Sequence, residues 1–262
     1  MALRKEGRIG DVLLLLEHAP VITLGRNAKS ANIVASPELL AERGVEVFEC
    51  DRGGDVTFHG PGQLVAYPIF DLRACPSSSP NRSSMGVIEF VRNLEEVLIR
   101  TCAEFGIPAR RIAGLTGVWT EPQALSTGNV GTGALPRRAE SKTQQFFEDQ
   151  QAKIAALGIH ISRGVTSHGI ALNVNTDLSF FDLIVPCGIS SKPVTSMQKE
   201  LARELAMQDV VHALSRNFGL VFRSQILWLD SLDALLGESV GVPMRPPENL
   251  RKIRSEDDSA WA

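Results

Sequence analysis

The sequence predicts an α+β fold, with strands and helices in an irregular order around a packed core. The chain has 262 residues, of which 44% are hydrophobic and 22% charged, so a sizeable core is expected and general disorder is not. Short apolar runs typical of strands lie before and between two long amphipathic helical segments. Because strands and helices do not alternate regularly, an α+β arrangement is favoured over a doubly wound sheet.

Several strands are expected in the first third of the chain. A proline separates two short apolar runs, Val12–Glu17 and Val21–Leu24, into two strands and a turn. Val45–Cys50 alternates apolar and acidic residues, as a half-buried strand does. Leu64–Leu72 is a further apolar run, and Pro68 within it predicts an edge position or a bulge.

Two helices are expected where apolar residues recur at intervals of three and four. The first begins at candidate N-caps Ser83 and Ser84 and runs to about Phe105, where a glycine and a proline stop it. The second covers Met207–Phe218 and ends before Gly219. Between the helices lie four strand candidates: Gly117–Thr120, Ile154–Leu157, Ile159–Ser162 and Gly169–Val174.

The chain is expected to hold one main domain over residues 1–222 and a partly disordered C-terminal extension over residues 223–262. A long surface insertion is expected at about residues 122–151, which are rich in Gly, Thr, Ser and Gln. The tail mixes proline with charged residues.

Composition also limits the location and the partners of the chain. No apolar run is long enough to span a bilayer, and the N-terminal segment lacks the pattern of a signal peptide. The four cysteines have no paired spacing, so a reducing cytoplasm is expected. The net charge of −3 argues against an extended basic surface for nucleic acid, which leaves small molecules or proteins as partners.

The densest chemical signal is the stretch from Asp51 to Gln63, which contains four glycines and a proline. Such a backbone can approach a ligand closely and present N–H groups to it, while Arg52 and His59 can orient the ligand. A glycine-rich hairpin without a ligand is the alternative. The stretch is neither a P-loop nor a dinucleotide fingerprint, because both spacings are absent.

Cys187 is the candidate nucleophile, because Pro186 and Gly188 end an apolar run and place its thiol on a turn. The alternative is a small buried hydrophobic residue. Reactivity requires thiolate, which a neighbouring cation favours, and Lys153 is the candidate cation. A solvated lysine beside a strand is the alternative, since a separation in sequence does not show that two side chains meet.

The histidines suggest no further chemistry of their own. His168 opens a strand, where it can line the mouth of a pocket or serve a structural purpose. The five histidines have no metal-ligand spacing, and the chain has no GxSxG nucleophile elbow. No metal site is therefore expected.

At these residues the chain resembles the lipoyl(octanoyl) transferases, which move an octanoyl group from acyl carrier protein to a lysine of lipoyl domains. The matching blocks fall in order along residues 12 to 218, and five ordered blocks are more specific than any single motif. They are Leu13–Arg26, Arg52–Gln63, Lys153–Gly158, His168–Asp177 and Pro186–Ile189. Relative to the family pattern, we expect a strand and most of a helix to be missing ahead of Leu13.

The resemblance implies a domain of the biotin/lipoyl-ligase type, with mixed sheets flanked by helices. It implies an acyl-thioester intermediate on Cys187, with Lys153 lowering the pKa of that thiol. No cofactor is implied, because a thioester is already activated. The implied substrate-binding residues are Arg52, Gly53, Gly54, Asp55, Val56, Thr57, Phe58, His59, Ala156, Leu157, Gly158, His168, Gly169, Ile170 and Ala171. We expect an apolar acyl groove among the strands around Val56, Phe58 and Ile170.

The resemblance also implies the partners. The donor is octanoyl-acyl carrier protein, and the acceptors are lipoyl domains of 2-oxoacid dehydrogenases and the glycine cleavage H protein. A monomer without nucleic-acid or membrane partners is expected, acting in the first step of lipoate cofactor biosynthesis.

Three alternatives remain open. An amidotransferase that moves lipoyl or octanoyl between two protein lysines differs in its donor. An ATP-dependent lipoate-protein ligase shares the glycine-rich block and the lysine but needs no cysteine, so Cys187 speaks against it. A non-catalytic module that binds acylated carrier proteins would gain no covalent mass from octanoyl-carrier protein.

Overall fold

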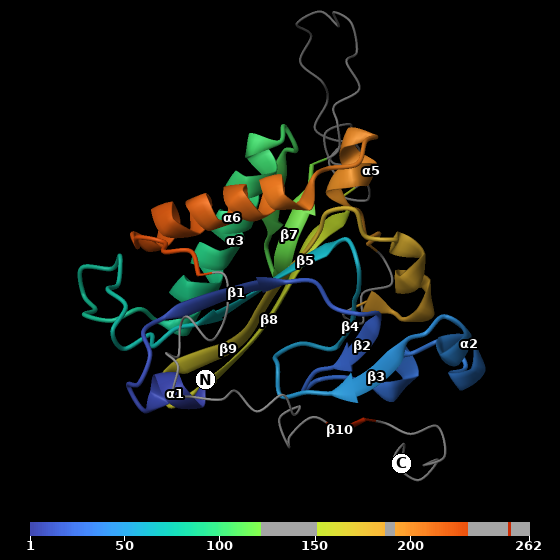
Figure 1. The fold of residues 1–262 in the computed structure, drawn as a ribbon, viewed down its shortest axis with the longest axis horizontal. Helices are drawn as coiled ribbons and strands as arrows, with labels where there is room; N and C mark the ends of the chain where they lie inside the picture. The colour runs from blue at the N-terminus through green and yellow to red at the C-terminus, as the bar shows by residue number, and fades with distance from the viewer. Residues whose placement is uncertain (122–150, 187–191, 230–250, 253–262) are drawn as a thin grey trace, which may run out of the picture.

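The computed structural model describes residues 1–121, 151–186, 192–229 and 251–252, whose strands form two sheets (Figure 1). All neighbours in the six-stranded sheet are antiparallel. Its order is β1 (Val12–Leu16), β5 (Gln63–Ile69), β9 (Val165–Asn173), β8 (Lys153–Ser162), β7 (Leu115–Thr120) and β6 (Ala109–Ile112).

The smaller sheet is mixed, because β2 and β3 are parallel while its other neighbours are antiparallel. Its order is β10 (Arg251–Lys252), β3 (Glu46–Glu49), β2 (Val21–Leu24) and β4 (Val56–His59). One antiparallel sheet and one mixed sheet, with helices beside them, confirm the expected α+β class.

Two long helices, α3 (Val87–Glu104) and α6 (Met207–Phe222), lie side by side over one face of the six-stranded sheet (Figure 1). The apolar stripe of α3 brings Phe90, Leu94 and Leu98 into the core, each with an exposed fraction of 0%. Truncating a buried leucine of this kind to alanine costs about 2–5 kcal/mol.

A second core lies beside the smaller sheet and joins it to the short helices around it. Val56 and Phe58 of β4 belong to this core, and the Phe58 ring stacks on Phe180 with a centroid distance of 4.7 Å. The shorter helical segments are α1 (Ala2–Lys5), η1 (Ser30–Asn32), α2 (Pro37–Glu42), η2 (Leu178–Leu183) and α5 (Met197–Leu201).

The ends of both long helices differ from the expectation. The N-cap of α3 is Gly86, so Ser83 and Ser84 do not cap it. Helix α6 continues through Gly219 to Phe222 and ends where Arg223 adopts a left-handed φ of 53°. A glycine inside a helix costs some stability but does not by itself end the helix.

The strands that carry the candidate site also differ from the expectation. A single strand, β8, covers the two that were expected on either side of Gly158. Strand β9 begins at Val165, ahead of Gly169. Pro68 lies in an inner strand: β5 pairs with β9 only as far as Ala66, so the missing N–H of Pro68 interrupts no bond to β9.

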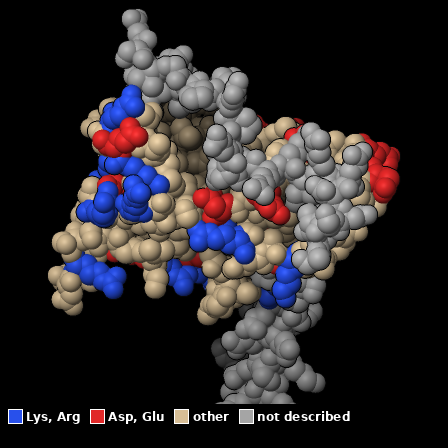
Figure 2. Space-filling view, turned by 90° about the horizontal axis from the view of Figure 1, so that it is seen from below, with Lys and Arg blue, Asp and Glu red and all other residues tan. Residues whose placement is uncertain are grey.

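The charged side chains form no continuous basic field on the face shown in Figure 2, where blue groups stand among red and tan ones. None of the helices within the described ranges is both long and apolar enough to cross a bilayer. Nearly all of the expected insertion, and residues 230–250 and 253–262 of the extension, lie outside the described residues.

Candidate active site

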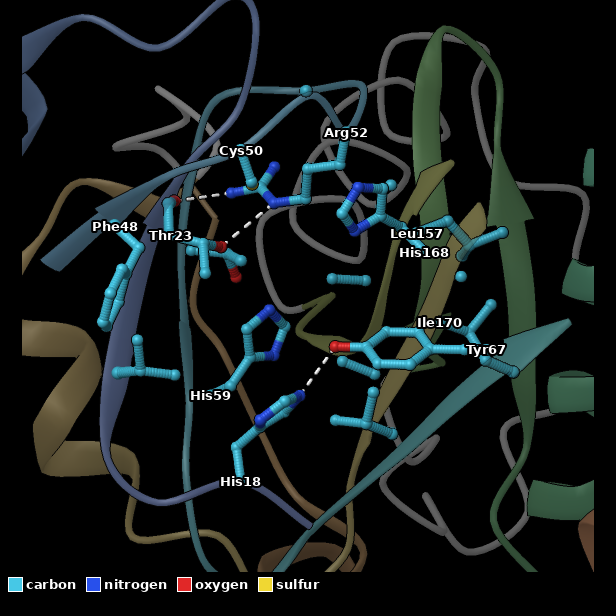
Figure 3. A pocket seen from close by; sticks show the side chains of 18 of the residues that line it. His18, Thr23, Phe48, Cys50, Arg52, His59, Tyr67, Leu157, His168 and Ile170 are labelled. Carbon is cyan, nitrogen blue, oxygen red and sulfur yellow. Dashed lines mark hydrogen bonds between the residues drawn. The ribbon is translucent and has the colours of Figure 1, made fainter. Parts of the chain in front are cut away.

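A cavity of ≈ 360 Å³ lies between the two sheets, with walls from both (Figure 3). This volume is within the range typical of small-molecule sites. The lining residues are His18, Ala19, Pro20, Val21, Thr23, Glu46, Phe48, Cys50, Arg52, Gly54, Asp55, Thr57, His59, Val65, Tyr67, Ala156, Leu157, Gly158, His168, Gly169, Ile170 and Ala171.

Strand β4 sends alternate side chains to opposite sides, and this determines which of its residues line the cavity. Thr57 and His59 line it, whereas Val56 and Phe58 are buried in the second core. The groove expected around Val56 and Phe58 therefore lies on the other face of β4, and only Ile170 of the expected groove residues lines the cavity.

The wall formed by β8 and β9 has small residues in register. Ala156 pairs with Ala171, and Gly158 pairs with Gly169. A Cβ at Gly169 would collide with the carbonyl oxygen of Ala66 on β5 and lie 2.7 Å from Pro68 Cδ. Gly169 is therefore required by the close approach of the neighbouring backbone.

The glycine-rich loop lies against this wall. Gly53 N–H donates to the carbonyl of Ile159 on β8 at 2.9 Å, and a Cβ at Gly158 would lie only 2.8 Å from the carbonyl oxygen of Gly53. Arg52 is buried, with an exposed fraction of 7%. It donates to Thr23 Oγ1 at 3.0 Å, to the Thr23 carbonyl at 2.6 Å and to the Gly53 carbonyl at 3.1 Å. These bonds of Arg52 hold the loop in place.

Asp51 connects the same loop to the far end of the β8–β9 hairpin. His168 Nε2 lies 2.6 Å from Asp51 Oδ1, and His160 Nε2 lies 3.5 Å from Asp51 Oδ2. His168 has a left-handed φ of 57°, which is uncommon for a residue other than glycine. The contact with Asp51 accompanies this costly backbone conformation and places the imidazole on the cavity wall.

Three aromatic rings gather inside the cavity, where Figure 3 shows His18, His59 and Tyr67 close to one another. His18 Nε2 lies 2.6 Å from Tyr67 Oη. Burial lowers the pKa of His18 and raises the pKa of Tyr67 to about 12, so both groups favour their neutral forms.

A chain of buried hydrogen bonds leads from His59 into the protein. His59 Nδ1 lies 2.7 Å from Gln63 Oε1, and Gln63 Nε2 donates to Asn173 Oδ1 at 2.9 Å. Asn173 Nδ2 donates to the Thr195 carbonyl at 2.9 Å, and Thr195 N–H donates to the Lys153 carbonyl at 2.9 Å. Burial lowers the pKa of His59 to about 3, and the nearby Arg52 contributes to the shift. This ring is therefore neutral at neutral pH.

Lys153 is buried, with an exposed fraction of 7%, and lines a small pocket beside the large cavity. A small pocket joins it to Pro186 and Val194, and three residues of that pocket also line the large cavity: Thr57, Ala156 and Ala171. Lys153 N–H donates to the Pro193 carbonyl at 2.8 Å. The segments on both sides of residues 187–191 thus lie near Lys153, while Cys187 itself is outside the described residues.

The structure thus brings most of the candidate site residues together. Twelve of the fifteen candidate substrate-binding residues line the cavity, and the other three are Gly53, Val56 and Phe58.

Sequence reasoning missed Gln63, Asn173 and Trp119. Gln63 had a signal, because it closes the glycine-rich stretch, whereas the pairing of Trp119 with Lys153 needed the strand register. Within the described ranges, no group of three or more His, Cys, Asp or Glu side chains is arranged to hold a metal ion.

Comparisons with known proteins identify the family. The sequence matches the family model for the lipoyl protein ligase A/B catalytic domain over residues 1–219. An octanoyltransferase of Koribacter versatilis is 57% identical over 255 residues, which cover 97% of this chain and 89% of the relative. An octanoyltransferase of Acidobacterium capsulatum is 54% identical over 237 residues, covering 90% and 87%.

Solved structures of similar fold include lipoate ligases. A bi-partite lipoate protein ligase of Thermoplasma acidophilum has a TM-score of 0.57 at 14% identity, covering 86% of this chain and 78% of that one. A lipoate-protein ligase A bound with ATP has a TM-score of 0.56 at 15% identity, covering 86% and 79%. At these identities the likeness concerns the fold alone, and it confirms the expected ligase-type architecture.

Proposed function

Because this chain belongs to the lipoyl protein ligase A/B catalytic domain family, we propose that it is an acyltransferase that moves octanoyl groups in lipoate cofactor biosynthesis. Its similarity to octanoyltransferases over nearly their whole length supports this activity. The donor is octanoyl-acyl carrier protein, and the acceptor is a lysine of the lipoyl domains of 2-oxoacid dehydrogenases and of the glycine cleavage H protein. The enzyme acts in the cytoplasm as a monomer, with residues 1–222 as its catalytic domain.

One observation carries the mechanism: Lys153 shares a small pocket with Pro186, and this pocket adjoins the large cavity. Cys187 follows Pro186 directly in the chain, and this adjacency supports a role for its thiol together with Lys153. A lysine ammonium beside a thiol favours the thiolate. We therefore assign Cys187 as the nucleophile and Lys153 as its partner.

The first half-reaction moves the acyl group to the enzyme. The Cys187 thiolate attacks the carbonyl carbon of the donor thioester, a new carbon–sulfur bond forms and the bond to the carrier sulfur breaks. Lys153 gives its proton to the departing thiolate, which leaves as a thiol. The exchange of one thioester for another is nearly isoenergetic, so no ATP is consumed.

The second half-reaction moves the acyl group to the acceptor. A neutral lysine amine attacks the acyl-enzyme carbonyl, the carbon–nitrogen bond forms and the bond to Cys187 breaks. The amine loses one proton, which the neutral Lys153 accepts. The enzyme thereby returns to the thiolate–ammonium state in which it began.

The cavity holds the octanoyl chain, because apolar side chains such as Val65, Leu157 and Ile170 cover much of its wall. Thr57, Ala156 and Ala171 line both this cavity and the Lys153 pocket. The octanoyl chain therefore lies in the large cavity, while the carbonyl carbon of the acyl group reaches the small pocket.

A transfer assay without ATP tests this function. Purified enzyme, octanoyl-acyl carrier protein and a lipoyl domain are mixed, and the mass of the lipoyl domain is followed. We expect the wild type to add one octanoyl group to the lipoyl domain and Cys187→Ser to add none. Transfer that requires ATP and octanoate would instead identify a ligase, and transfer from an octanoylated protein lysine would identify an amidotransferase.

A further inference from the structure

The pairing between β7 and β8 changes register beside Trp119. Val118 pairs with Ala155. Trp119, the next residue on β7, pairs with Lys153, which leaves Ile154 as an extra residue on β8. Such a bulge reverses the faces of the residues beyond it. Regular pairing would have placed Lys153 on the helix-covered face with Ala155, whereas the bulge places it on the face of Trp119.

The aromatic ring of Trp119 and the ammonium of Lys153 meet as a result of this bulge. Lys153 Nζ lies 4.7 Å from the indole centroid. This is within the ~6 Å at which a cation is attracted to an aromatic face. The exposed fractions are 1% for Trp119 and 7% for Lys153. Because little water reaches this pair, the attraction is weakly screened.

Gly117 lies beside both partners of this contact. It lies two residues before Trp119 on β7, and a Cβ added there would lie 3.4 Å from Lys153 Cε and 3.6 Å from Trp119 Nε1. The same Cβ would lie only 2.9 Å from the Ala155 carbonyl oxygen, and Gly117 has a φ of 131°. A side chain at residue 117 would therefore touch both partners at ordinary contact distances and clash with the Ala155 carbonyl oxygen.

We propose that Trp119 is a positioning residue for Lys153, whose ammonium it holds beside the small pocket that adjoins the cavity. The inference rests on the proposed function, in which Lys153 acts on Cys187. A lysine side chain is long and flexible, so an ammonium held against a rigid ring spends more time in one place. Misplacing a catalytic group by about 1 Å can reduce a rate about a hundredfold.

Trp119→Phe and Trp119→Leu are a matched pair for the test. Both replace the indole by a smaller apolar side chain and leave a void, but only phenylalanine keeps an aromatic face. We expect kcat for octanoyl transfer to fall about tenfold further in Trp119→Leu than in Trp119→Phe, with the KM for the donor changing less than about twofold. An equal loss of kcat in both variants would overturn the proposal, because the indole would then act by packing alone.

Trp228→Leu is the control, because Trp228 lies after α6 with an exposed fraction of 54%. This variant should keep the wild-type kcat. A loss of kcat there as large as that in Trp119→Leu would also count against a specific contact between Trp119 and Lys153.

A spectroscopic test needs no turnover. The chain has three tryptophans, so Trp228→Phe together with Trp261→Phe leaves Trp119 as the only indole emitter. In this background, Lys153→Met removes the cation and keeps a side chain of similar length. We expect the emission of Trp119 to change in wavelength or intensity, whereas an unchanged spectrum would overturn the contact. Wild-type enzyme that transfers no octanoyl group would instead contradict the proposed function and leave this readout valid.

Discussion

The imidazole of His59 and the amide of Gln63 determine each other's orientation inside the cavity. Gln63 Nε2 donates to the Phe58 carbonyl at 3.3 Å and to Asn173 Oδ1 at 2.9 Å, which leaves Gln63 Oε1 to accept from His59 Nδ1. Asn173 is oriented in turn by the Thr195 carbonyl, which can only accept. His59 thus carries its proton on Nδ1 and keeps Nε2 as a hydrogen-bond acceptor.

Burial of His59 predicts a dependence of stability on pH. The pKa of His59 falls from 6.5 to about 3 in the folded protein, so the unfolded chain binds a proton more readily between these values. The contribution of His59 to stability is therefore lost as the pH falls below 6.5 toward 3.

Urea denaturation of the wild type and His59→Asn at pH 7 and pH 5 checks this linkage. We expect the free energy of unfolding to fall by about 2 kcal/mol more in the wild type. His212→Asn, a change on the outer face of α6, should follow the wild type. An equal fall in the wild type and His59→Asn would show that folding does not lower the pKa of His59.

Gly169→Ala should destabilise the protein by about 3 kcal/mol, because the added Cβ collides with the Ala66 carbonyl on the neighbouring strand. The free energy of unfolding from urea denaturation measures the effect. Gly10→Ala is the matched control, since a Cβ there meets nothing within 4 Å. A Gly169→Ala variant as stable as Gly10→Ala would mean that β5 and β9 lie further apart than described.

Lys153→Met should slow the alkylation of Cys187 by iodoacetamide about tenfold or more near neutral pH, because the thiolate loses its cationic partner. Mass analysis of the peptide that contains Cys187 measures the rate. Burial raises the pKa of Cys75 to about 11 and of Cys102 to about 12, so these thiols react slowly in the same assay. The exposed Lys199 offers the control variant Lys199→Met, which should alkylate at the wild-type rate. An unchanged rate in Lys153→Met would remove Lys153 from its assigned role.

The fold class and most elements could be predicted, because their signals are local. The three-and-four spacing of α3 and the short apolar runs of β1 and β2 depend only on neighbouring residues. The ends of elements were less predictable. Gly219 stays within α6, and Gly158 stays within β8 because its missing side chain makes room for Gly53, a residue far away in sequence.

The candidate site, like the fold, could be predicted only where its signals are local. The glycine-rich loop and the β8–β9 wall were predictable as motifs, and the structure brings them to one cavity. The alternation that turns Phe58 into the second core depends on where β4 begins. The sequence marks Gln63 only by its place at the end of the glycine-rich stretch. The contacts of Gln63 and Trp119 could not be predicted, because their partners, Asn173 and Lys153, lie on other strands.

The central claim is that Cys187 carries the octanoyl group with the help of Lys153. Its most direct test is the intact mass of the enzyme after brief mixing with octanoyl-acyl carrier protein, without ATP and without acceptor. We expect the wild type to gain the mass of one octanoyl group, Cys187→Ser to gain none, and Lys153→Met to gain it far more slowly. The claim would be contradicted if neither the wild type nor Cys187→Ser gained an octanoyl group, while both transferred octanoyl to a lipoyl domain equally well.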